Sequence, residues 1–296
     1  MGRLETIEKK HGRGMLRIHL AVFLFGLAGL FGKFIAASPL YIVLARTAFA
    51  ALALGAYTKL SAQHSLDFRP RYLAQGAILA AHWYLFFLSI QISSVAVGLV
   101  TFSSFPLFVT ILEPLFFKEA LKKKDVATAA LVLGGIILVV PDIDLDNTLT
   151  LGALYGILSG ASFAILALVN RDNARKGNPV ATAFFQNLFA ALFLGGTIGF
   201  LYFWSPKPPN PPDVVDLPGL IFLGVVCTAL AHTLFIQSLA IIRAQTAAVI
   251  AGLEPVYGIA LAFFLLGEIP GPTTLAGGAL IIGATLAAGY FSREET

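Results

Sequence analysis

Charged residues are scarce in this chain of 296 residues. Asp, Glu, Lys and Arg together make up only 12% of the positions, whereas 57% are hydrophobic, and the mean hydropathy is +0.84. Soluble domains carry about a quarter of their residues as charges. The composition therefore excludes an ordinary soluble protein and predicts a polytopic membrane protein.

Several motifs are also missing. The single cysteine, Cys227, lies in an apolar run, which excludes a disulfide framework and a cysteine-ligated metal site. No phosphate-binding loop of the P-loop type occurs, so direct drive by ATP has no support. No cluster of nucleophiles, acids or histidines is visible in the loops. We therefore expect no cofactor and no metal.

The basic N-terminal segment also lacks a small-residue cleavage site behind a short apolar run, so we expect it to be retained as a tail.

Long apolar runs are what the sequence does contain. About 20 helical residues cross a hydrocarbon core of about 30 Å, and this length divides the chain into ten expected spans. They are residues 16–36, 39–57, 72–90, 94–117, 126–140, 149–169, 179–203, 217–240, 244–267 and 273–291.

The basic residues lie almost entirely on one side of these spans. Of the 20 lysines and arginines, only Lys207 falls in the opposite set of loops, while Lys33 and Arg46 lie within spans. By the positive-inside rule both termini are cytoplasmic. We expect a multi-pass plasma-membrane protein, in a bacterium an inner-membrane one. Because the charge follows topology, it gives no support to nucleic-acid binding.

The two halves of the chain share the spacing of certain proline, glutamate and glycine residues. Three pairs of residues recur at a separation of 149 positions: Pro106 and Pro255, Glu119 and Glu268, and Gly134 and Gly283. Five spans in each half is an odd number, so the second copy enters the membrane from the other side. The sequence therefore predicts an all-α integral membrane protein with ten transmembrane helices arranged as two inverted five-helix repeats. The expected division is a tail at 1–15, a first repeat at 16–140, an outer linker at 141–148, a second repeat at 149–291 and a tail at 292–296.

The pattern of glycine, proline and glutamate residues resembles that of a known family. The run Phe263-Phe264-Leu265-Leu266-Gly267-Glu268, followed by a glycine-punctuated helix from Gly277 to Gly283, is similar to the EamA domain of the drug/metabolite transporter superfamily. Lys33 and Arg46 are also similar to that family's first copy. Within the superfamily the pattern looks most like the YddG-type exporters of aromatic and other amino acids. The resemblance implies export of small metabolites, with amino acids or amphipathic drugs as the cargo.

Glu254 is the most central acid of the chain, about eleven residues into the ninth span and next to Pro255. An ionisable group at this depth is costly and faces a cavity or a partner. It is a candidate proton acceptor or counter-charge for a substrate ammonium group, and the alternative is a neutral carboxyl with an architectural role. Its counterpart in the first repeat is Phe105, so a symmetric scaffold role does not explain it.

His82 and His232 lie at mid-depth in the third and eighth spans and are nearly equivalent in the two repeats. They are candidates for lining a polar cavity or relaying protons together with Glu254. The alternative is a neutral imidazole hydrogen-bonded across helices. A zinc site formed by these residues has no supporting spacing.

Aromatic residues, Phe86 and Phe102 among them, cluster around these polar positions and predict an apolar substrate pocket with a few polar anchors. Besides the three polar candidates, the expected substrate-binding residues are Trp83, Tyr84, Phe87, Thr101, Phe105, Phe108, Tyr257 and Lys33. Lys33 is expected either to meet a substrate carboxylate or to extend towards the membrane interface. Arg46 is expected to form a structural pair or to contact a carboxylate.

Small residues such as Gly134 and Gly283 are expected to allow close helix packing, within one chain or in a homodimer.

The leading interpretation is a secondary transporter that works by alternating access, with a small-molecule substrate and the lipid bilayer as its partners. Two alternatives remain. One is an intramembrane enzyme, and the other is a scaffold or channel without transport activity.

Overall fold

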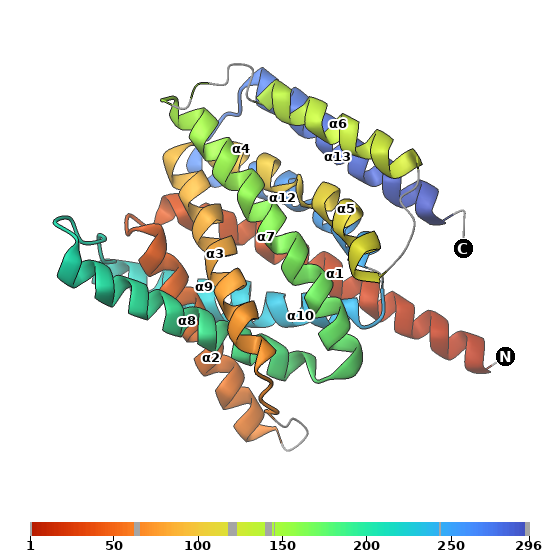
Figure 1. The fold of residues 1–296 in the computed structure, drawn as a ribbon, viewed down its shortest axis with the longest axis horizontal. Helices are drawn as coiled ribbons and strands as arrows, with labels where there is room; N and C mark the ends of the chain where they lie inside the picture. The colour runs from red at the N-terminus through yellow and green to blue at the C-terminus, as the bar shows by residue number, and fades with distance from the viewer. Residues whose placement is uncertain are drawn as a thin grey trace.

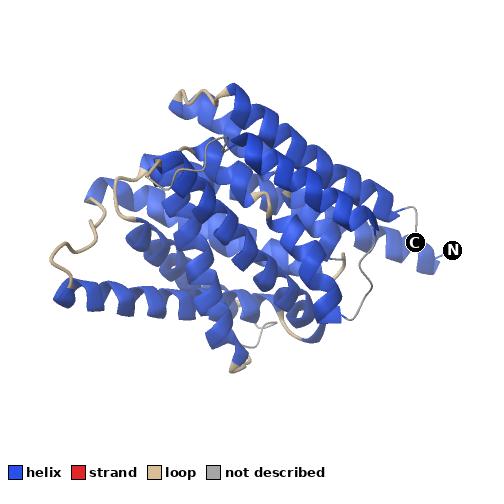
Figure 2. Cartoon of the chain, turned by 45° about the horizontal axis from the view of Figure 1, so that its top comes forward, coloured by secondary structure: helices blue, strands red, loops and turns tan. Residues whose placement is uncertain are grey.

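The computed structural model describes residues 2–61, 66–117, 123–139, 144, 146–242 and 244–293. Every regular element in these ranges is helical (Figure 2). The first half of the chain forms α1 (Gly2–Phe34), α2 (Pro39–Leu60), α3 (Arg71–Ile92), α4 (Val95–Phe102), α5 (Phe105–Phe117) and α6 (Lys123–Val139). The second half forms α7 (Thr148–Lys176), α8 (Pro179–Trp204), η1 (Val214–Asp216), α9 (Leu217–Gly224), η2 (Val225–Leu230), α10 (Ala231–Leu239), α11 (Ala244–Ala251), α12 (Glu254–Leu266) and α13 (Pro272–Arg293).

Ten apolar helical segments account for the expected spans. Seven stretches of the described chain are long and apolar enough to cross a membrane, and three shorter apolar helices, Ala130–Val139, Glu254–Leu266 and Pro272–Ala284, lie in the remaining three expected spans. The prediction of an all-helical membrane protein with ten helices is confirmed. The expected linker at 141–148 lies largely outside the described residues.

The fourth and ninth spans are broken, whereas the sequence predicts each as one continuous helix. The first break separates α4 from α5 at Ser103 and Ser104, and the second separates α11 from α12 at Gly252 and Leu253. The two breaks are 149 residues apart, and the half-helices on either side have equal lengths in the two repeats. A proline, which has no backbone N–H to donate, is the second residue after each break. Broken helices of this kind form the substrate sites of many transporters.

Helix contacts repeat between the halves. α7 packs on α3 and α5, and in the same way α1 packs on α10 and α12. α2 pairs with α8, α4 with α12, and α6 with α13, which lie side by side at one edge of the bundle (Figure 1). The pairs α2–α8 and α6–α13 join equivalent helices of the two halves, and the contact of α4 with α12 is matched by that of α11 with α5. This reciprocity is the pattern that a twofold relation between the halves produces.

The Leu-Gly-Glu motif joins the two halves. Gly267 ends α12 with a left-handed backbone conformation, φ 67°, which glycine adopts without steric cost. The chain then turns so that the Glu268 carboxylate accepts hydrogen bonds from the backbone N–H groups of Val95, at 3.1 Å, and Ala96, at 3.0 Å. The motif therefore caps the first turn of α4, where the N–H groups have no partner within the helix. The equivalent Glu119 lies outside the described residues.

The α6–α13 pair crosses at glycines other than those expected. A Cβ atom added at Gly135 would lie 2.8 Å from the Gly277 carbonyl oxygen, and one added at Gly277 would lie 2.5 Å from the Gly135 carbonyl oxygen. A Cβ atom added at Gly134 would lie at an ordinary contact distance of 3.7 Å from Leu280 Cδ2, and one added at Gly283 would meet no described residue within 4 Å. Within this chain the close contact is therefore made at Gly135 and Gly277, because the spacing of small residues does not fix which face meets the neighbour. Packing of Gly134 and Gly283 in a homodimer stays a prediction.

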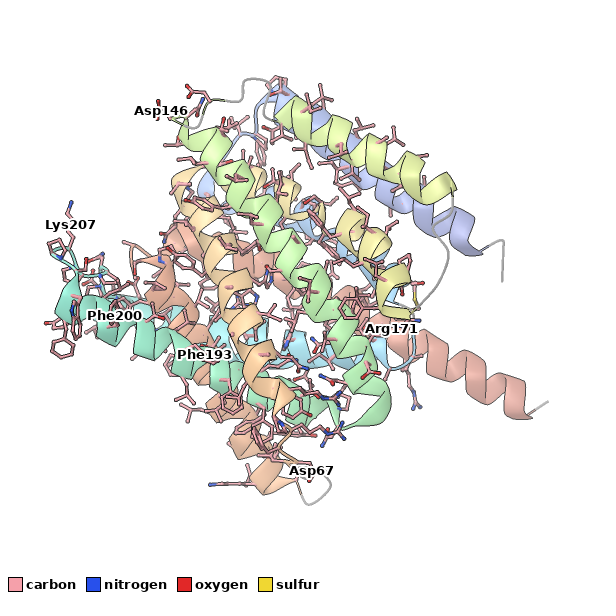
Figure 3. All side chains as sticks on the ribbon, in the orientation of Figure 1. Asp67, Asp146, Arg171, Phe193, Phe200 and Lys207 are labelled. Carbon is pink, nitrogen blue, oxygen red and sulfur yellow. The ribbon has the colours of Figure 1, made fainter. Side chains whose placement is uncertain are left out.

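The bundle has one basic end and one end with few charges. Asp146 and Lys207 lie on one side of the molecule, whereas Asp67 and Arg171 lie on the other (Figure 3). We call the end that carries Arg69, Arg71 and Arg171 the basic face. Phe193 and Phe200 lie exposed on α8 between the two ends, as expected for a surface that meets lipid. The cytoplasmic location of the basic face stays a prediction.

Candidate functional site

A small cavity lies at the centre of the bundle, between helices of both halves. It has a volume of about 20 Å³, which is room for a single water molecule. The residues that line it are Phe25 and Ala28 of α1, Arg46 of α2, His82, Trp83 and Phe86 of α3, Phe102 of α4, Phe163 of α7, His232 of α10 and Glu254 of α12. The lining is aromatic, with a few polar groups, and the conformation is closed.

Arg46 is held at the cavity by a local irregularity in the eighth span. The segment η2 is a π-helix, and π-turns are rare and frequent at functional sites. Within it, the Thr228 hydroxyl donates to the Leu223 carbonyl at 2.7 Å and accepts from Nε of Arg46 at 2.9 Å. Gly224 lets α2 approach, because a Cβ atom there would lie 3.0 Å from the Arg46 carbonyl oxygen. These contacts fix the guanidinium in a buried position, 1% exposed.

The Arg46 guanidinium lies over aromatic rings. Its central carbon is 3.9 Å from the centre of the Trp83 ring and 5.4 Å from that of Phe87. A cation at this distance from a ring face is attracted by the ring's quadrupole. The aromatic neighbours therefore orient the charge and offset part of the cost of burying it.

Glu254 reaches the cavity because the ninth span is broken. It is the first residue of α12 and 4% exposed. α1 crosses α12 at this point through Gly26 and Gly258, and a Cβ atom added at Gly26 would lie 2.9 Å from the Glu254 carbonyl oxygen. The two glycines bring the backbones close together, so the position of the Glu254 side chain depends on this crossing.

Arg46 and Glu254 face the same cavity with unused hydrogen-bonding capacity. Within the described part of the chain, Nε is the only Arg46 guanidinium nitrogen that makes a hydrogen bond, and the Glu254 carboxyl makes none. No ion pair within 4.0 Å joins the two side chains, although they act on each other electrostatically. An unpaired buried charge is costly. The Arg46 guanidinium and the Glu254 carboxyl are therefore both available to a ligand.

The two histidines line the cavity, and each bonds to another helix. Nδ1 of His82 lies 2.8 Å from Oγ of Ser159 on α7, whose hydroxyl donates to the His82 carbonyl at 3.0 Å. Nε2 of His232 lies 3.0 Å from Oε1 of Gln186 on α8. Trp83 and His232 meet edge to face, with ring centres 5.7 Å apart. Both histidines therefore join helices as well as lining the cavity.

Four of the residues predicted from the sequence come together at the cavity: His82, Trp83, His232 and Glu254. Phe87 and Phe105 lie in a second layer behind it. Phe87 touches the Arg46 guanidinium, and Phe105 is completely buried against Phe102 and Phe163, with ring centres 5.3 and 5.2 Å apart. The counterpart of Glu254 thus supports the aromatic wall without lining the cavity.

The other predicted residues lie elsewhere. Their spacing in the sequence shows which residues share a helix face, but it does not show which neighbour that face meets in a broken or tilted span. Thr101 bonds to the Val97 carbonyl at 2.7 Å and packs where α4 meets Gly156 of α7. Tyr257 packs edge to face on Phe23 of α1, and Phe108 packs partly buried against the core.

Tyr84 faces away from the centre, into a shallow groove between α3 and α8. Lys33 donates to the carbonyl oxygens of Gln91 and Ser93 at 3.2 and 3.0 Å. It therefore satisfies carbonyl groups at the end of α3, where a positive charge is favourable. Neither residue lines the cavity, and the contact of Lys33 with a substrate carboxylate stays a prediction.

Two aromatic lining residues, Phe25 and Phe163, are not among those singled out from the sequence. Phe163 lies 4.9 Å from the His82 ring, centre to centre. The spacing of the sequence gives one indication of its position, because Phe163 lies four residues after Ser159 and therefore on the same helix face. As for metals, no group of three histidine, cysteine or acidic side chains is arranged to hold an ion among the described residues.

Comparisons with known proteins agree with this architecture. A family model described as the EamA-like transporter family matches residues 12–140 and 150–290. An uncharacterized transporter of Archaeoglobus fulgidus is 26% identical over 206 residues, which cover 68% of this chain and 69% of that protein. The uncharacterized transporter YxxF of Bacillus subtilis is 23% identical over 272 residues, 89% of this chain and 85% of that protein.

A third relative has a named substrate. It is an S-adenosylmethionine uptake transporter of Rickettsia bellii, 27% identical over 198 residues, which cover 67% of this chain and 64% of that protein. Among solved structures, one crystal structure covers 97% of this chain and 100% of its own with a TM-score of 0.70 and 16% identity. This last likeness concerns the fold alone.

Proposed function

Because the chain belongs to the EamA-like transporter family, we propose that it is a secondary transporter of small molecules that carry both an ammonium and a carboxylate group, above all α-amino acids. Transport activity follows from the family, and it sets aside the alternative of an intramembrane enzyme. The substrate class is our proposal and rests on the central cavity.

The observation that carries the proposal is that the Arg46 guanidinium and the Glu254 carboxyl line one cavity and both have free hydrogen-bonding capacity among the described residues. Guanidinium groups bind carboxylates through two parallel hydrogen bonds, which assigns the substrate carboxylate to Arg46. The Glu254 carboxyl then receives the substrate ammonium group. Phe25, Phe102 and Phe163 offer an apolar wall to a side chain, so aromatic and other apolar amino acids fit best.

The volume of the cavity supports alternating access. A space of about 20 Å³ does not hold an amino acid, so the helices around it must separate before a substrate binds. The lining comes from both halves of the chain, and one of its charged groups begins the half-helix α12. Movement of two inverted repeats against each other opens such a site first to one side and then to the other. In this scheme the basic face lies in the cytoplasm.

Direction and exact cargo are further parts of the proposal. The resemblance to amino-acid exporters favours export of aromatic or apolar amino acids, and it also allows amphipathic drugs. The name of the Rickettsia relative introduces S-adenosylmethionine as a second candidate, because this molecule ends in the same amino and carboxylate groups. Proton coupling through Glu254, His82 and His232 stays a prediction, as does a homodimer.

Counterflow in proteoliposomes tests the proposal. Vesicles are loaded with unlabelled phenylalanine, and the uptake of trace labelled phenylalanine is followed. We expect saturable exchange that is competed by other apolar amino acids. Absence of exchange with a broad panel of amino acids and with S-adenosylmethionine would overturn the proposed substrate class and would favour a scaffold. Exchange that does not saturate would favour a channel.

A further inference from the structure

Four buried amide side chains lie between the central cavity and the basic face. We call them the amide cluster: Gln75 of α3, Asn170 and Asn173 of α7, and Gln186 of α8, each no more than 3% exposed. Gln186 Nε2 donates to Gln75 Oε1 at 2.9 Å and to Asn170 Oδ1 at 2.5 Å. Asn173 Nδ2 donates to the same Gln75 oxygen at 2.9 Å.

At its inner edge the amide cluster reaches the central cavity. The Gln186 oxygen lies 3.0 Å from Nε2 of His232, and His232 lines the cavity. The cluster and the cavity therefore share one hydrogen-bonded chain of side chains.

Further polar side chains lie on the same helices between the cluster and the surface. Tyr72 lies about one turn before Gln75, and its hydroxyl is 3.3 Å from that of Thr182, about one turn before Gln186. Beyond them, Arg71 and Asp172 form an ion pair of 3.4 Å that is about one third exposed. A column of polar side chains thus runs from the basic face to the cavity.

The amide cluster contains hydrogen-bond donors and acceptors that are not paired with each other. Gln75 Nε2, Asn170 Nδ2 and Asn173 Oδ1 are buried without a hydrogen-bond partner among the residues that the structure describes. A cluster that served only to join helices would be expected to pair these groups, because burying an unpaired polar atom is unfavourable. Unpaired donors and acceptors side by side are suited to a bound molecule that both donates and accepts hydrogen bonds, such as water or a small zwitterion.

The opposite side of the cavity has a different lining. On α3, beyond Trp83 and away from the basic face, Phe87 and Ile90 are completely buried, and both lie against Gly32 of α1. This layer is apolar and closely packed, since a Cβ atom at Gly32 would lie 2.9 Å from Ile90 Cγ2. The two routes out of the cavity are therefore unequal in polarity.

We propose that the amide cluster is the passage between the central cavity and the basic face, through which water and the polar substrate move. The identity of the substrate rests on the function proposed above, whereas the passage itself rests on the cluster. It opens when α7 and α8 move away from α3 and α10, which exchanges the amide–amide hydrogen bonds for bonds to water and substrate. The apolar layer around Ile90 closes the other side.

Cysteine labelling tests the passage without any substrate. Replacement of the single native cysteine by Cys227→Ala gives a background into which Gln75→Cys, Asn173→Cys and Ile90→Cys are introduced one at a time. Gln75 and Ile90 lie on the same helix, 3% and 0% exposed, so Ile90→Cys is a matched control. The probe is a membrane-impermeant, positively charged methanethiosulfonate, applied to vesicles of either orientation.

We expect Gln75→Cys and Asn173→Cys to react from the basic face at least about ten times faster than Ile90→Cys. Adding Gln186→Leu to Gln75→Cys should slow that reaction, because it makes the passage apolar. Equal rates at Gln75→Cys and Ile90→Cys, or faster reaction from the opposite face, would overturn the proposal. If one variant does not fold, as judged by size-exclusion chromatography, the other gives the same comparison.

The outcomes for the passage and for the substrate are separate. Fast labelling from the basic face together with no exchange of amino acids supports the passage and removes the proposed substrate. Saturable exchange of phenylalanine with unreactive Gln75→Cys and Asn173→Cys overturns the passage and leaves the proposed substrate in place.

Discussion

The guanidinium carbon of Arg46 lies 3.9 Å from the centre of the Trp83 ring, in the same small cavity that the Glu254 carboxyl faces. Arg46 comes from the first half of the chain and Glu254 from the second. Any movement that separates the halves therefore changes the distance between the guanidinium and the carboxyl. A substrate that bridges them would be held best in one intermediate arrangement, and this links its recognition to the movement of the helices.

Replacement of Arg46 tests the assigned carboxylate contact. Arg46→Lys keeps the charge but loses the planar group that lies on Trp83 and binds a carboxylate through two bonds. We expect KM for phenylalanine counterflow to rise at least about ten-fold, which corresponds to about 1.4 kcal/mol. Arg13→Lys, at an exposed position of α1, is the matched control and should leave KM unchanged. An unchanged KM in Arg46→Lys would remove Arg46 from substrate recognition.

Glu254→Gln separates charge from shape, because the two side chains have nearly the same size. The variant should fold normally, since the Glu254 carboxyl makes no hydrogen bond within the described residues. Its transport rate should fall at least about ten-fold, because the substrate ammonium group loses its counter-charge. Counterflow and size-exclusion chromatography together check this expectation. Full activity would reduce Glu254 to an architectural role.

Trp83→Leu removes the ring under the guanidinium and keeps an apolar side chain. A buried cation–π contact contributes about 0.5–2 kcal/mol, so the transport rate at low substrate concentration should fall by about 2-fold to 30-fold. Trp83→Phe keeps a ring and should show a smaller loss. If both variants lose the same amount, volume and not the ring's electrostatic attraction is what matters at this position.

The crossing of α1 and α12 should be sensitive to a single methyl group. Gly26→Ala places a Cβ atom 2.9 Å from the Glu254 carbonyl oxygen, so the helices must separate, and crowding of this kind costs about 1–3 kcal/mol. Gly283→Ala meets no atom of the described residues within 4 Å and is the control. We expect a lower thermal midpoint in detergent for Gly26→Ala alone. Equal midpoints would show that the crossing is not tightly packed.

Much of the fold was predictable because hydropathy and charge report on the membrane directly. The length of apolar runs gave the ten helices, and a residue as costly as Glu254 at mid-depth indicated the cavity. The breaks at Ser103 and at Gly252 were not predicted, because the apolar character continues across both of them.

Helix rotation explains the misplaced residues of the candidate site. Thr101 and Tyr257 lie on the correct helices but face neighbouring helices, since the rotation of each half-helix depends on close contacts such as those at Gly156 and Gly26. The position of Arg46 over Trp83 depends on the π-turn that holds Thr228, and no spacing in the sequence indicates that turn.

The most direct test of the central claim is competition by charge-modified substrates. Counterflow of labelled phenylalanine is measured in the presence of unlabelled phenylalanine, phenylalaninamide or N-acetylphenylalanine. All three share the ring, but phenylalaninamide lacks the carboxylate and N-acetylphenylalanine lacks the ammonium group. If Arg46 and Glu254 bind these two groups, the free amino acid should compete at least about ten times better than either derivative. Equal competition by all three compounds would contradict recognition by the two charges.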